Sequence, residues 1–323
     1  FQELRIPKPD YNLGVGSGSH AWQTAEIMKR LEPVILEEKP DLVIVVGDVN
    51  STLAGALVAA KSHFPVAHIE AGLRSFNLSM PEEINRRLTD HISDFLFVTE
   101  PSGIKNLLNE GIPKSRIFYV GNIMIDTLLK HKEAILNRAI LKRLGLNEKE
   151  YGILTLHRSE NVDDEKTLRR IISAVQEIQK MIKVVWLIHP RTKKMIEHFN
   201  FTNLINTLDN LIILPPVGYV EMLNLMASSK FVMTDSGGIQ EETTVLGVPC
   251  LTLREVTERP ITEDIGTNIV VGTKKRKIVS EVKNILAGQF KKGKIPKLWD
   301  GKTAKRILGI LDKKLGMLRN NLK

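Results

Sequence analysis

The sequence predicts an α/β protein with two successive doubly wound parallel sheets, and three observations support this. The chain has 323 residues, more than a single hydrophobic core usually serves. From residue 41 onward, short runs rich in β-branched residues alternate with helical patterns, which is typical of buried parallel strands and their connecting helices. The alternation stops at a polar stretch, residues 145–150, and then starts again, so we expect two domains.

The predicted elements follow from these runs. Strands are expected at residues 41–48, 65–70, 95–98 and 117–120 in the first half, and at 152–156, 184–188, 211–214, 231–234 and 249–253 in the second. Helices are expected at 51–60, 81–93, 104–110, 126–144, 166–181, 193–199, 220–228 and 239–246. Sheets of this kind bind ligands beyond the carboxyl ends of their strands, so the chemistry is expected there.

Composition limits the classes of function. The apolar content of 42% is that of a globular protein, and no apolar run reaches the ~18–20 residues of a membrane-spanning helix, so we expect no membrane insertion. The net charge of +9 comes from residues 274–323, which hold 16 Lys and Arg against 3 Asp and Glu, whereas the first 273 residues hold 30 against 34. We interpret this segment as a solvated basic helix face, with a polyanion-binding patch as the alternative, and expect no nucleic-acid partner.

The spacing of cysteine and histidine narrows the chemistry further. Cys250 is the only cysteine, which excludes an internal disulfide and suits a reducing, cytoplasmic location. The histidines lack metal-ligand spacing such as His-Glu-x-x-His, so no metal is expected. The chain has no Gly-x-Ser-x-Gly sequence, which argues against a serine hydrolase.

The strongest local signal is Thr234-Asp-Ser-Gly-Gly-Ile-Gln-Glu-Glu242, where a strand ends, a Gly-Gly turn follows and a helix begins. Glycines allow a ligand to approach the backbone, and the first N–H groups of a helix bind phosphate oxygens. Glu241 and Glu242 lie one turn further on, and one of them is expected to reach ribose hydroxyls. The alternative is a tight turn with solvated glutamates. Arg259 offers a guanidinium to the same phosphates, or forms a surface salt bridge.

A second group of candidates follows the strands of the first half. Asp48 and Glu70 end neighbouring strands, so both carboxylates are expected to face one crevice. Glu82 and Arg86 lie four residues apart at the start of a helix and share one face, although a helix-start carboxylate with its i+4 partner explains those two equally well. In the second half, His157 follows a strand and is a candidate for proton transfer or for binding a diphosphate.

Six segments occur in one order along the chain. They are Gly47-Asp-Val-Asn-Ser-Thr52, His68-Ile-Glu-Ala-Gly-Leu-Arg74, Pro81-Glu-Glu-Ile-Asn-Arg86, His157-Arg-Ser-Glu-Asn161, Thr234-Asp-Ser-Gly-Gly-Ile-Gln-Glu-Glu242 and Thr257-Glu-Arg-Pro260. Together they resemble the non-hydrolysing UDP-N-acetylglucosamine 2-epimerases, and the resemblance runs over about residues 16–306.

The resemblance implies a GT-B fold, in which two Rossmann-like domains face a cleft and a C-terminal helix returns to the first domain. The domains are then residues 1–140 with 303–323, and residues 146–302, which bind UDP. It also implies reversible conversion of UDP-N-acetylglucosamine into UDP-N-acetylmannosamine, by elimination of UDP to 2-acetamidoglucal and re-addition after inversion at C2. No cofactor is needed for this reaction, and a homodimer is expected.

The resemblance also assigns roles to particular residues. A catalytic role falls to Asp48, Glu70, Glu82 and His157, with no carboxylate assigned to either face of C2. Substrate-binding roles fall to Arg86, Arg158, Glu160, Met222, Ser236, Gly237, Gly238, Glu242 and Arg259. Among these, Met222 stands where the family places a residue whose backbone meets uracil, and Glu242 stands at the ribose ligand.

The sequence departs from the family pattern at two points. The family opens with a strand and an arginine-bearing turn that this sequence starts beyond, so we expect the natural protein to extend further and the chain as it stands to be a poor enzyme. Trp22 stands where many bacterial members have an arginine of a second substrate site, which argues against activation by substrate. The alternative function is a GT-B glycosyltransferase with a UDP-sugar donor, which would not need the three clustered carboxylates.

Overall fold

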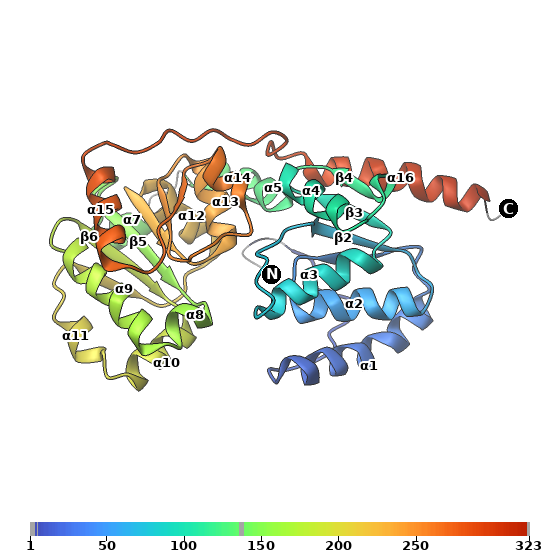
Figure 1. Ribbon diagram of the computed structural model, residues 1–323, viewed down its shortest axis with the longest axis horizontal. Coiled ribbons are helices and arrows are strands. Elements are labelled where there is room, and N and C mark those ends of the chain that lie inside the picture. Colours follow the sequence, from blue (N-terminus) through green and yellow to red (C-terminus); the bar gives the residue numbers. More distant parts are fainter. Residues whose placement is uncertain (1–3, 5, 136–138, 322–323) are drawn as a thin grey trace. The chain divides into compact units, whose positions relative to one another are not determined.

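The computed structural model describes residues 4, 6–135 and 139–321, and it divides into two compact units. The first unit consists of Phe1–Ile123 and Asp300–Lys323, and the second unit is Met124–Trp299 (Figure 1). Each unit contains one parallel sheet with helices packed on it. The α/β class that the sequence predicts is therefore confirmed.

The first unit is built on a four-stranded parallel sheet in the order β1-β2-β3-β4. Its strands are β1 (Val43–Val46), β2 (Val66–Ala71), β3 (Phe95–Val98) and β4 (Ile117–Tyr119). Each is a short run rich in β-branched or aromatic residues, because a parallel sheet is covered on both faces. The carboxyl ends of all four strands lie at one edge of this sheet.

Helices on both faces enclose the first sheet. They are α1 (His20–Glu38), α2 (Asn50–Lys61), α3 (Pro81–Ile92), α4 (Pro101–Asn109) and α16 (Thr303–Asn321), with a single 3₁₀ turn, η1 (Lys114–Arg116), before β4. Val66 packs in a cluster with α1 and α2, whereas its neighbours Ala67 and Ile69 pack with Ile307 and Leu311 of α16. Figure 1 shows α16 on the opposite side of the sheet from α2 and α3. The predicted returning C-terminal helix therefore completes the core of the first unit.

The second unit is built on a six-stranded parallel sheet in the order β10-β9-β8-β5-β6-β7. Its strands are β5 (Tyr151–Leu156), β6 (Lys183–Ile188), β7 (Leu211–Leu214), β8 (Phe231–Thr234), β9 (Cys250–Thr252) and β10 (Asn268–Val270). The chain enters at β5, in the middle, adds strands on one side and then adds the rest on the other. The winding reverses between β5 and β8, and doubly wound sheets bind ligands at that point.

The helices of the second unit connect these strands. They are α5 (Ile123–Lys130), α6 (Lys132–Ile135), α7 (Ala139–Leu144), α8 (Ser159–Val162), α9 (Glu165–Ile178), α10 (Pro190–His198), α11 (Thr202–Asn206), α12 (Tyr219–Ser228), α13 (Gly237–Leu246), α14 (Pro260–Asp264) and α15 (Lys275–Leu286). The helix predicted at 126–144 is divided into α5, α6 and α7, and residues 136–138 lie outside the described ranges.

The division between the units differs from the boundary that the sequence predicts at residues 140–146. Leu128 of α5, together with Ile140 and Leu141 of α7, packs in a cluster with Tyr151 and Ile153 of β5. These apolar contacts place α5 to α7 in the second unit, and the division lies after residue 123.

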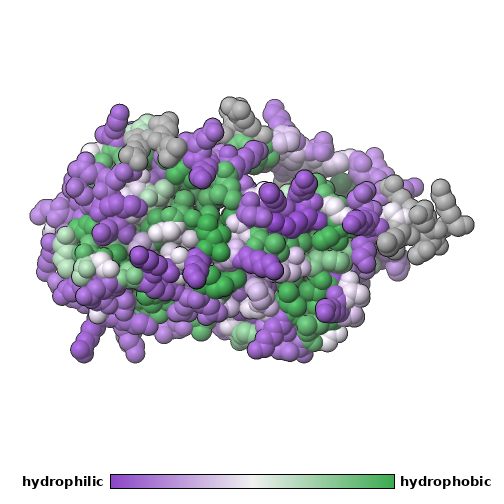
Figure 2. All heavy atoms as spheres, turned by 90° about the horizontal axis from the view of Figure 1, so that it is seen from above, coloured by the Kyte–Doolittle hydropathy of each residue, from purple (hydrophilic) through white to green (hydrophobic). Residues whose placement is uncertain are grey.

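The surface carries the charge that the sequence places near the end of the chain. In α15, Lys275, Arg276 and Lys277 are exposed whereas Ile278 and Val282 are buried, which is the arrangement of a solvated basic helix face. Figure 2 shows hydrophilic residues over much of the face drawn, with hydrophobic residues interspersed among them. In the described part of the chain, no helix combines the length and apolar character needed to cross a membrane.

The packing of α16 on the first sheet is testable with two leucines of that helix. Leu311 is 5% exposed, whereas Leu308 is 65% exposed. We expect Leu311→Ala to lower the free energy of unfolding of the first unit by about 2–5 kcal/mol, because the truncation removes apolar contacts and leaves a cavity. Leu308→Ala should change it by less than about 0.5 kcal/mol. Urea denaturation followed by circular dichroism measures both, and equal effects would contradict this packing.

Candidate active site

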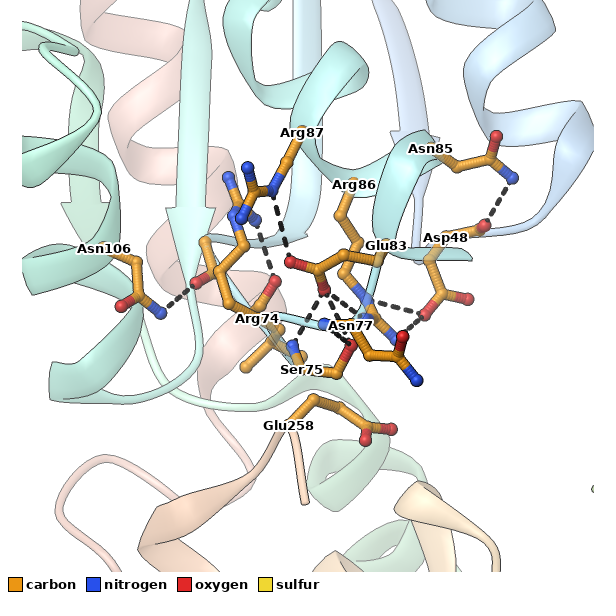
Figure 3. Close-up of polar contacts among 12 residues, drawn as sticks. Asp48, Arg74, Ser75, Asn77, Glu83, Asn85, Arg86, Arg87, Asn106 and Glu258 are labelled. Atoms are coloured by element: carbon orange, nitrogen blue, oxygen red, sulfur yellow. Dashed lines mark hydrogen bonds and ion pairs between the residues drawn. The ribbon is translucent and has the colours of Figure 1, made fainter. Parts of the chain in front are cut away.

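Asp48 and Arg86 meet at the carboxyl edge of the first sheet. Asp48 lies in the turn after β1, and Arg86 lies on α3. The guanidinium donates to one oxygen of Asp48 from Nε at 3.0 Å and from Nη2 at 2.7 Å, and it donates from Nη1 to Glu83 at 2.9 Å (Figure 3). Arg86 is only 2% exposed. This paired geometry fixes the direction in which the Asp48 carboxylate points.

The two glutamates at the start of α3 have different surroundings. Glu83, to which the sequence pattern assigns no role, accepts hydrogen bonds from the backbone N–H and the hydroxyl of Ser75 at 2.8 and 3.0 Å. Burial raises the pKa of Glu83, but these hydrogen bonds and the charge of Arg86 outweigh it, so the pKa lies below its ordinary value. Glu82 is half-buried in the first helical turn. Glu83 therefore holds the loop before α3, and nothing in an adjacent pair of glutamates predicts which one does so.

Glu70 occupies a strained position in β2. The pairing register of β2 with β3 shifts between Ile69 and Ala71, which marks a bulge, and Glu70 has a φ of +72°. Side chains other than those of Asn and Asp rarely adopt this left-handed region. Such conformations cost on the order of 1–3 kcal/mol and cluster at functional sites, where a bulge re-aims a side chain. The sequence predicts a carboxylate at this strand end, whereas no pattern in it predicts the bulge.

In the second unit, a buried carboxylate ties together the ends of β5 and β8. Asp235 accepts hydrogen bonds from the backbone N–H groups of His157 and Arg158, both at 3.0 Å, and from the side-chain amide of Asn161 at 3.1 Å. Its second oxygen lies 2.8 Å from Nδ1 of His157. The imidazole therefore donates from Nδ1 to Asp235 and directs Nε2 the other way, which is how a carboxylate orients a functional histidine. The side chain of Arg158 lies 3.9 Å from Glu258.

A pocket of about 280 Å³ lies beside His157, at the point where the winding of the second sheet reverses. Its lining includes Leu187, Pro216, Val217, Met222, Ser236 and Ile239. Mostly apolar walls with a few polar groups suit a flat heterocyclic base. Two residues that the sequence assigns to substrate binding, Met222 and Ser236, share this pocket.

The predicted diphosphate turn is the start of α13, with Ser236 immediately before the helix. The first N–H groups of a helix have no partner within it, and the helix dipole favours an anion there. A Cβ atom on Gly237 would lie 2.3 Å from Nη1 of Arg259, so a side chain at this position would displace the guanidinium. A Cβ atom on Gly238 would have only Cε of Met124 nearby, at 4.0 Å, so this position faces open space.

Arg259 is held by two carboxylates in a chain of ion pairs. Its Nε lies 2.8 Å from Glu241 and its Nη1 donates to Glu258 at 2.7 Å. Glu258 also accepts from Arg254 at 2.6 Å, and Arg254 donates to Glu160 at 3.0 Å. Arg259 is 8% exposed, so the surface salt bridge considered from the sequence is in fact a buried network. Glu160, a predicted substrate-binding residue, contacts Arg254 in this structure.

Glu242 differs from its neighbour Glu241, which is paired with Arg259. Glu242 is 5% exposed and accepts a hydrogen bond from the Tyr219 hydroxyl at 3.0 Å. Burial raises the pKa of Glu242 to about 7, although the hydrogen bond from Tyr219 by itself lowers this pKa. Carboxyl groups whose pKa is raised by burial are common in binding and catalytic sites.

The predicted site residues thus form two groups, one at the carboxyl edge of each sheet. The first unit contains Asp48, Glu70, Glu82 and Arg86, and the second contains His157, Arg158, Glu160, Met222, Ser236, Gly237, Gly238, Glu242 and Arg259. Within the described ranges, no group of three or more His, Cys, Asp and Glu side chains is placed to hold a metal ion.

Strand-end carboxylates beside a fixed guanidinium in one unit, and a helix start suited to phosphate in the other, are features of an enzyme that acts on a phosphate-bearing substrate. Comparison with known families makes this class specific. The sequence model of the UDP-N-acetylglucosamine 2-epimerases matches residues 1–312, and the chain belongs to that family.

Two relatives and one solved structure show how close the relationship is. The UDP-N-acetylglucosamine 2-epimerase of Methanocaldococcus jannaschii is 46% identical over 317 residues, which cover 96% of this chain and 86% of the relative. The UDP-2,3-diacetamido-2,3-dideoxy-D-glucuronate 2-epimerase of Pseudomonas aeruginosa is 44% identical over 88% of this chain and 79% of the relative. The crystal structure of the M. jannaschii enzyme in complex with UDP-GlcNAc and UDP matches at a TM-score of 0.90 and 45% identity, covering 97% of this chain and 87% of that one. The GT-B fold and the family predicted from the sequence are confirmed.

The pKa of Glu242 makes the stability of the second unit depend on pH. A glutamate titrates near 4.5 when unfolded, and Glu242 titrates at about 7 when folded, so stability falls as pH rises from 4.5 to 7. We expect Glu242→Gln to be more stable than the wild type at pH 8 by on the order of 1–3 kcal/mol, and by less than about 1 kcal/mol at pH 5.

Urea denaturation at the two pH values measures this difference. Glu241→Gln is the matched control, because it removes a carboxylate that is paired with Arg259 and should therefore destabilise the protein at both pH values. Equal stability of Glu242→Gln and the wild type at pH 8 would mean that Glu242 is ionised in the fold at little cost.

Proposed function

We propose that the chain interconverts UDP-N-acetylglucosamine and UDP-N-acetylmannosamine, and that its catalytic groups are the carboxylates at the edge of the first sheet. The observation that carries this proposal is that Asp48 is fixed by Arg86 while Glu70 is re-aimed by a bulge in the neighbouring strand. Inversion at C2 needs one group to remove a proton and another to return it on the opposite face. Asp48, Glu70 and Glu82 are the candidates for these two roles.

In this mechanism the C2 proton passes to a carboxylate while the bond from C1 to the diphosphate breaks, which leaves 2-acetamidoglucal and UDP. Protonation of C2 from the opposite face and re-addition of UDP at C1 then complete the epimerisation. No oxidant or reductant is required, because no change in oxidation state occurs overall.

The second unit supplies the groups proposed to bind UDP. The pocket beside Met222 takes the uracil, Glu242 accepts from the ribose hydroxyls, and the start of α13 binds the diphosphate through the backbone N–H groups of Gly237 and Gly238. Nε2 of His157, oriented by Asp235, is directed away from that carboxylate and is proposed to donate to the departing diphosphate. Arg158, Glu160 and Arg259 support this end of the site through their ion pairs.

Two finer properties complete the proposal. We infer a homodimer from the family resemblance, which light scattering after size-exclusion chromatography tests. We infer a cytoplasmic location from Cys250, a single and fully buried cysteine that needs no oxidising compartment.

The alternative function, a glycosyltransferase with a UDP-sugar donor, differs in requiring an acceptor. Incubation of UDP-N-acetylglucosamine with the protein and no acceptor should yield UDP-N-acetylmannosamine by NMR. Parallel incubation with UDP-2,3-diacetamido-2,3-dideoxy-D-glucuronate determines which sugar is preferred. Absence of product from both, with transfer to an added acceptor, would favour the glycosyltransferase.

The carboxylate roles are testable by hydrogen exchange at C2. In deuterium oxide we expect Asp48→Asn and Glu70→Gln to retain UDP binding and to lose C2 exchange by on the order of 10²–10⁴-fold, the usual cost of removing a general acid or base. Glu165→Gln, in the exposed first turn of α9, is the control and should exchange at the wild-type rate. Near-normal exchange in both site variants would remove these residues from the mechanism.

The role of the Gly-Gly turn is testable at the position where the fold leaves room. We expect Gly238→Val to weaken UDP binding by at least about tenfold, because its side chain enters the space over the helix start while contacting little of the protein. Gly309→Val, at another open helical glycine in the first unit, should leave UDP binding unchanged. Calorimetry with UDP and thermal unfolding of each variant separate binding from stability, and unchanged affinity of Gly238→Val would mean that the turn is only structural.

A further inference from the structure

His68 is a buried ionisable residue to which the proposed mechanism gives no role. It lies on β2, is 0% exposed, and both nitrogens of its ring have a partner. Nδ1 lies 2.7 Å from Oδ1 of Asp90 on α3, and Nε2 lies 2.8 Å from the carbonyl oxygen of Gly47, which follows β1. The imidazole thus bridges a helix and the neighbouring strand.

Both partners of His68 are acceptors, which determines its charge. A carbonyl oxygen cannot donate, and Asp90 is ionised because its other oxygen faces two further donors, the backbone N–H of Gly72 and the guanidinium of Arg74. Each ring nitrogen must therefore carry a proton, so His68 is an imidazolium. Burial alone lowers the pKa of His68, but the charge and hydrogen bond of Asp90 and the hydrogen bond to Gly47 outweigh it and raise the pKa above its usual value.

The second oxygen of Asp90 contacts residues that follow the carboxyl end of the same strand. Oδ2 accepts from the backbone N–H of Gly72 at 3.1 Å and lies 2.7 Å from Nη2 of Arg74, which also lies 2.7 Å from Glu110, the residue that follows α4. Two cations and two carboxylates therefore balance in the cluster of His68, Arg74, Asp90 and Glu110. The other charged group near the ring is Glu70, on the same strand.

The positions joined by this cluster are adjacent to both candidate catalytic carboxylates. His68 and Gly72 each lie two residues from Glu70, one on either side of the bulge, and Gly47 immediately precedes Asp48. Gly47 and Gly72 have φ values of +72° and +82°, which glycine adopts readily, whereas Glu70, between His68 and Gly72, has an unusual φ of +72°. One carboxylate on α3 thus fixes the two loops from which the proposed chemistry is performed.

The geometry points to Asp90 as a positioning residue for the reaction: through the ring of His68 it holds the turn that carries Asp48, and through the N–H of Gly72 it holds the bulge that carries Glu70. This inference rests on the proposed function. Neither Asp90 nor His68 contacts substrate in this account, because both are fully buried. Their effect is on the placement of Asp48 and Glu70.

Asp94 provides a matched comparison at the opposite end of the same strand. Asp94 lies between α3 and β3, and its carboxylate accepts from the backbone N–H of Val66, the first residue of β2, at 2.9 Å. Asp94→Asn and Asp90→Asn each remove the charge of a carboxylate that binds β2. Asp94 binds the start of this strand, whereas Asp90 binds the end near Glu70.

We expect Asp90→Asn to lower kcat for epimerisation by on the order of 10²-fold, because displacement of catalytic groups by about 1 Å has that effect. KM and the affinity for UDP should stay within about twofold of the wild type, since the residues proposed to bind UDP lie in the second unit. Asp94→Asn should keep the wild-type kcat, whatever its effect on thermal stability. Asp90→Glu, which restores the charge, should recover part of kcat.

A spectroscopic measurement tests the charge of His68 without reference to turnover. In protein labelled with ¹⁵N at histidine, we expect both ring nitrogens of His68 to be protonated at pH 7.5 in the wild type, and one to be unprotonated in Asp90→Asn. A bare ring nitrogen on His68 in the wild type would overturn the inference.

The kinetic outcomes separate this inference from the proposed function. If the wild type does not epimerise either UDP sugar, the proposed function fails and the positioning role falls with it. If the wild type epimerises, but Asp90→Asn keeps the wild-type kcat or loses no more than Asp94→Asn, the function stands and the positioning role is wrong.

Discussion

A carboxylate removed from water costs several kcal/mol unless hydrogen bonds and opposite charges replace its hydration, and both sheets of this chain end on carboxylates under that constraint. Asp90 in the first unit and Asp235 in the second are each fully buried; Asp90 accepts from one backbone N–H and Asp235 from two, and each also contacts the ring of a histidine. Burial makes every one of these partners obligatory, because losing one would leave a buried charge uncompensated. The hydrogen bonds to these two carboxylates tie the loops beyond the strands to the body of each unit, although loops are ordinarily the most mobile parts of a fold.

The same principle governs the arginines. Arg86 lies between Asp48 and Glu83, and Arg259 lies between Glu241 and Glu258, so each guanidinium is already oriented and largely neutralised. A diphosphate that binds such a guanidinium gains less electrostatic free energy than it would from an unpaired one. The loss of side-chain entropy on binding is also smaller, because the guanidinium is already oriented. In the proposed function, the backbone dipoles at the start of α13 therefore supply much of the attraction for phosphate.

The extent to which sequence predicts this structure depends on the range of the interactions involved. The spans predicted at 211–214 and 231–234 coincide with β7 and β8, because a short β-branched run between helices is a local signal. The first helix, α1, was not predicted, since Pro33 and the glycines before it interrupt the local pattern. The strand-end carboxylates could be recognised from their positions after predicted strands. The pairing of His157 with Asp235 joins residues 78 positions apart, so no local sequence pattern predicts it. The bulge at Glu70 is likewise a product of tertiary packing, since it depends on contacts of β2 that no sequence pattern encodes.

The first unit is assembled from both ends of the chain, and this has a consequence during synthesis. The sheet face formed by Ala67, Ile69, Phe95 and Phe97 is covered by α16, which a ribosome makes only after all of Met124–Trp299. At ordinary translation rates that interval is roughly ten to forty seconds, during which the second unit has time to fold and the apolar face of the first remains open. The nascent protein therefore passes through a state suited to chaperone binding, and slower translation of the second unit would prolong it.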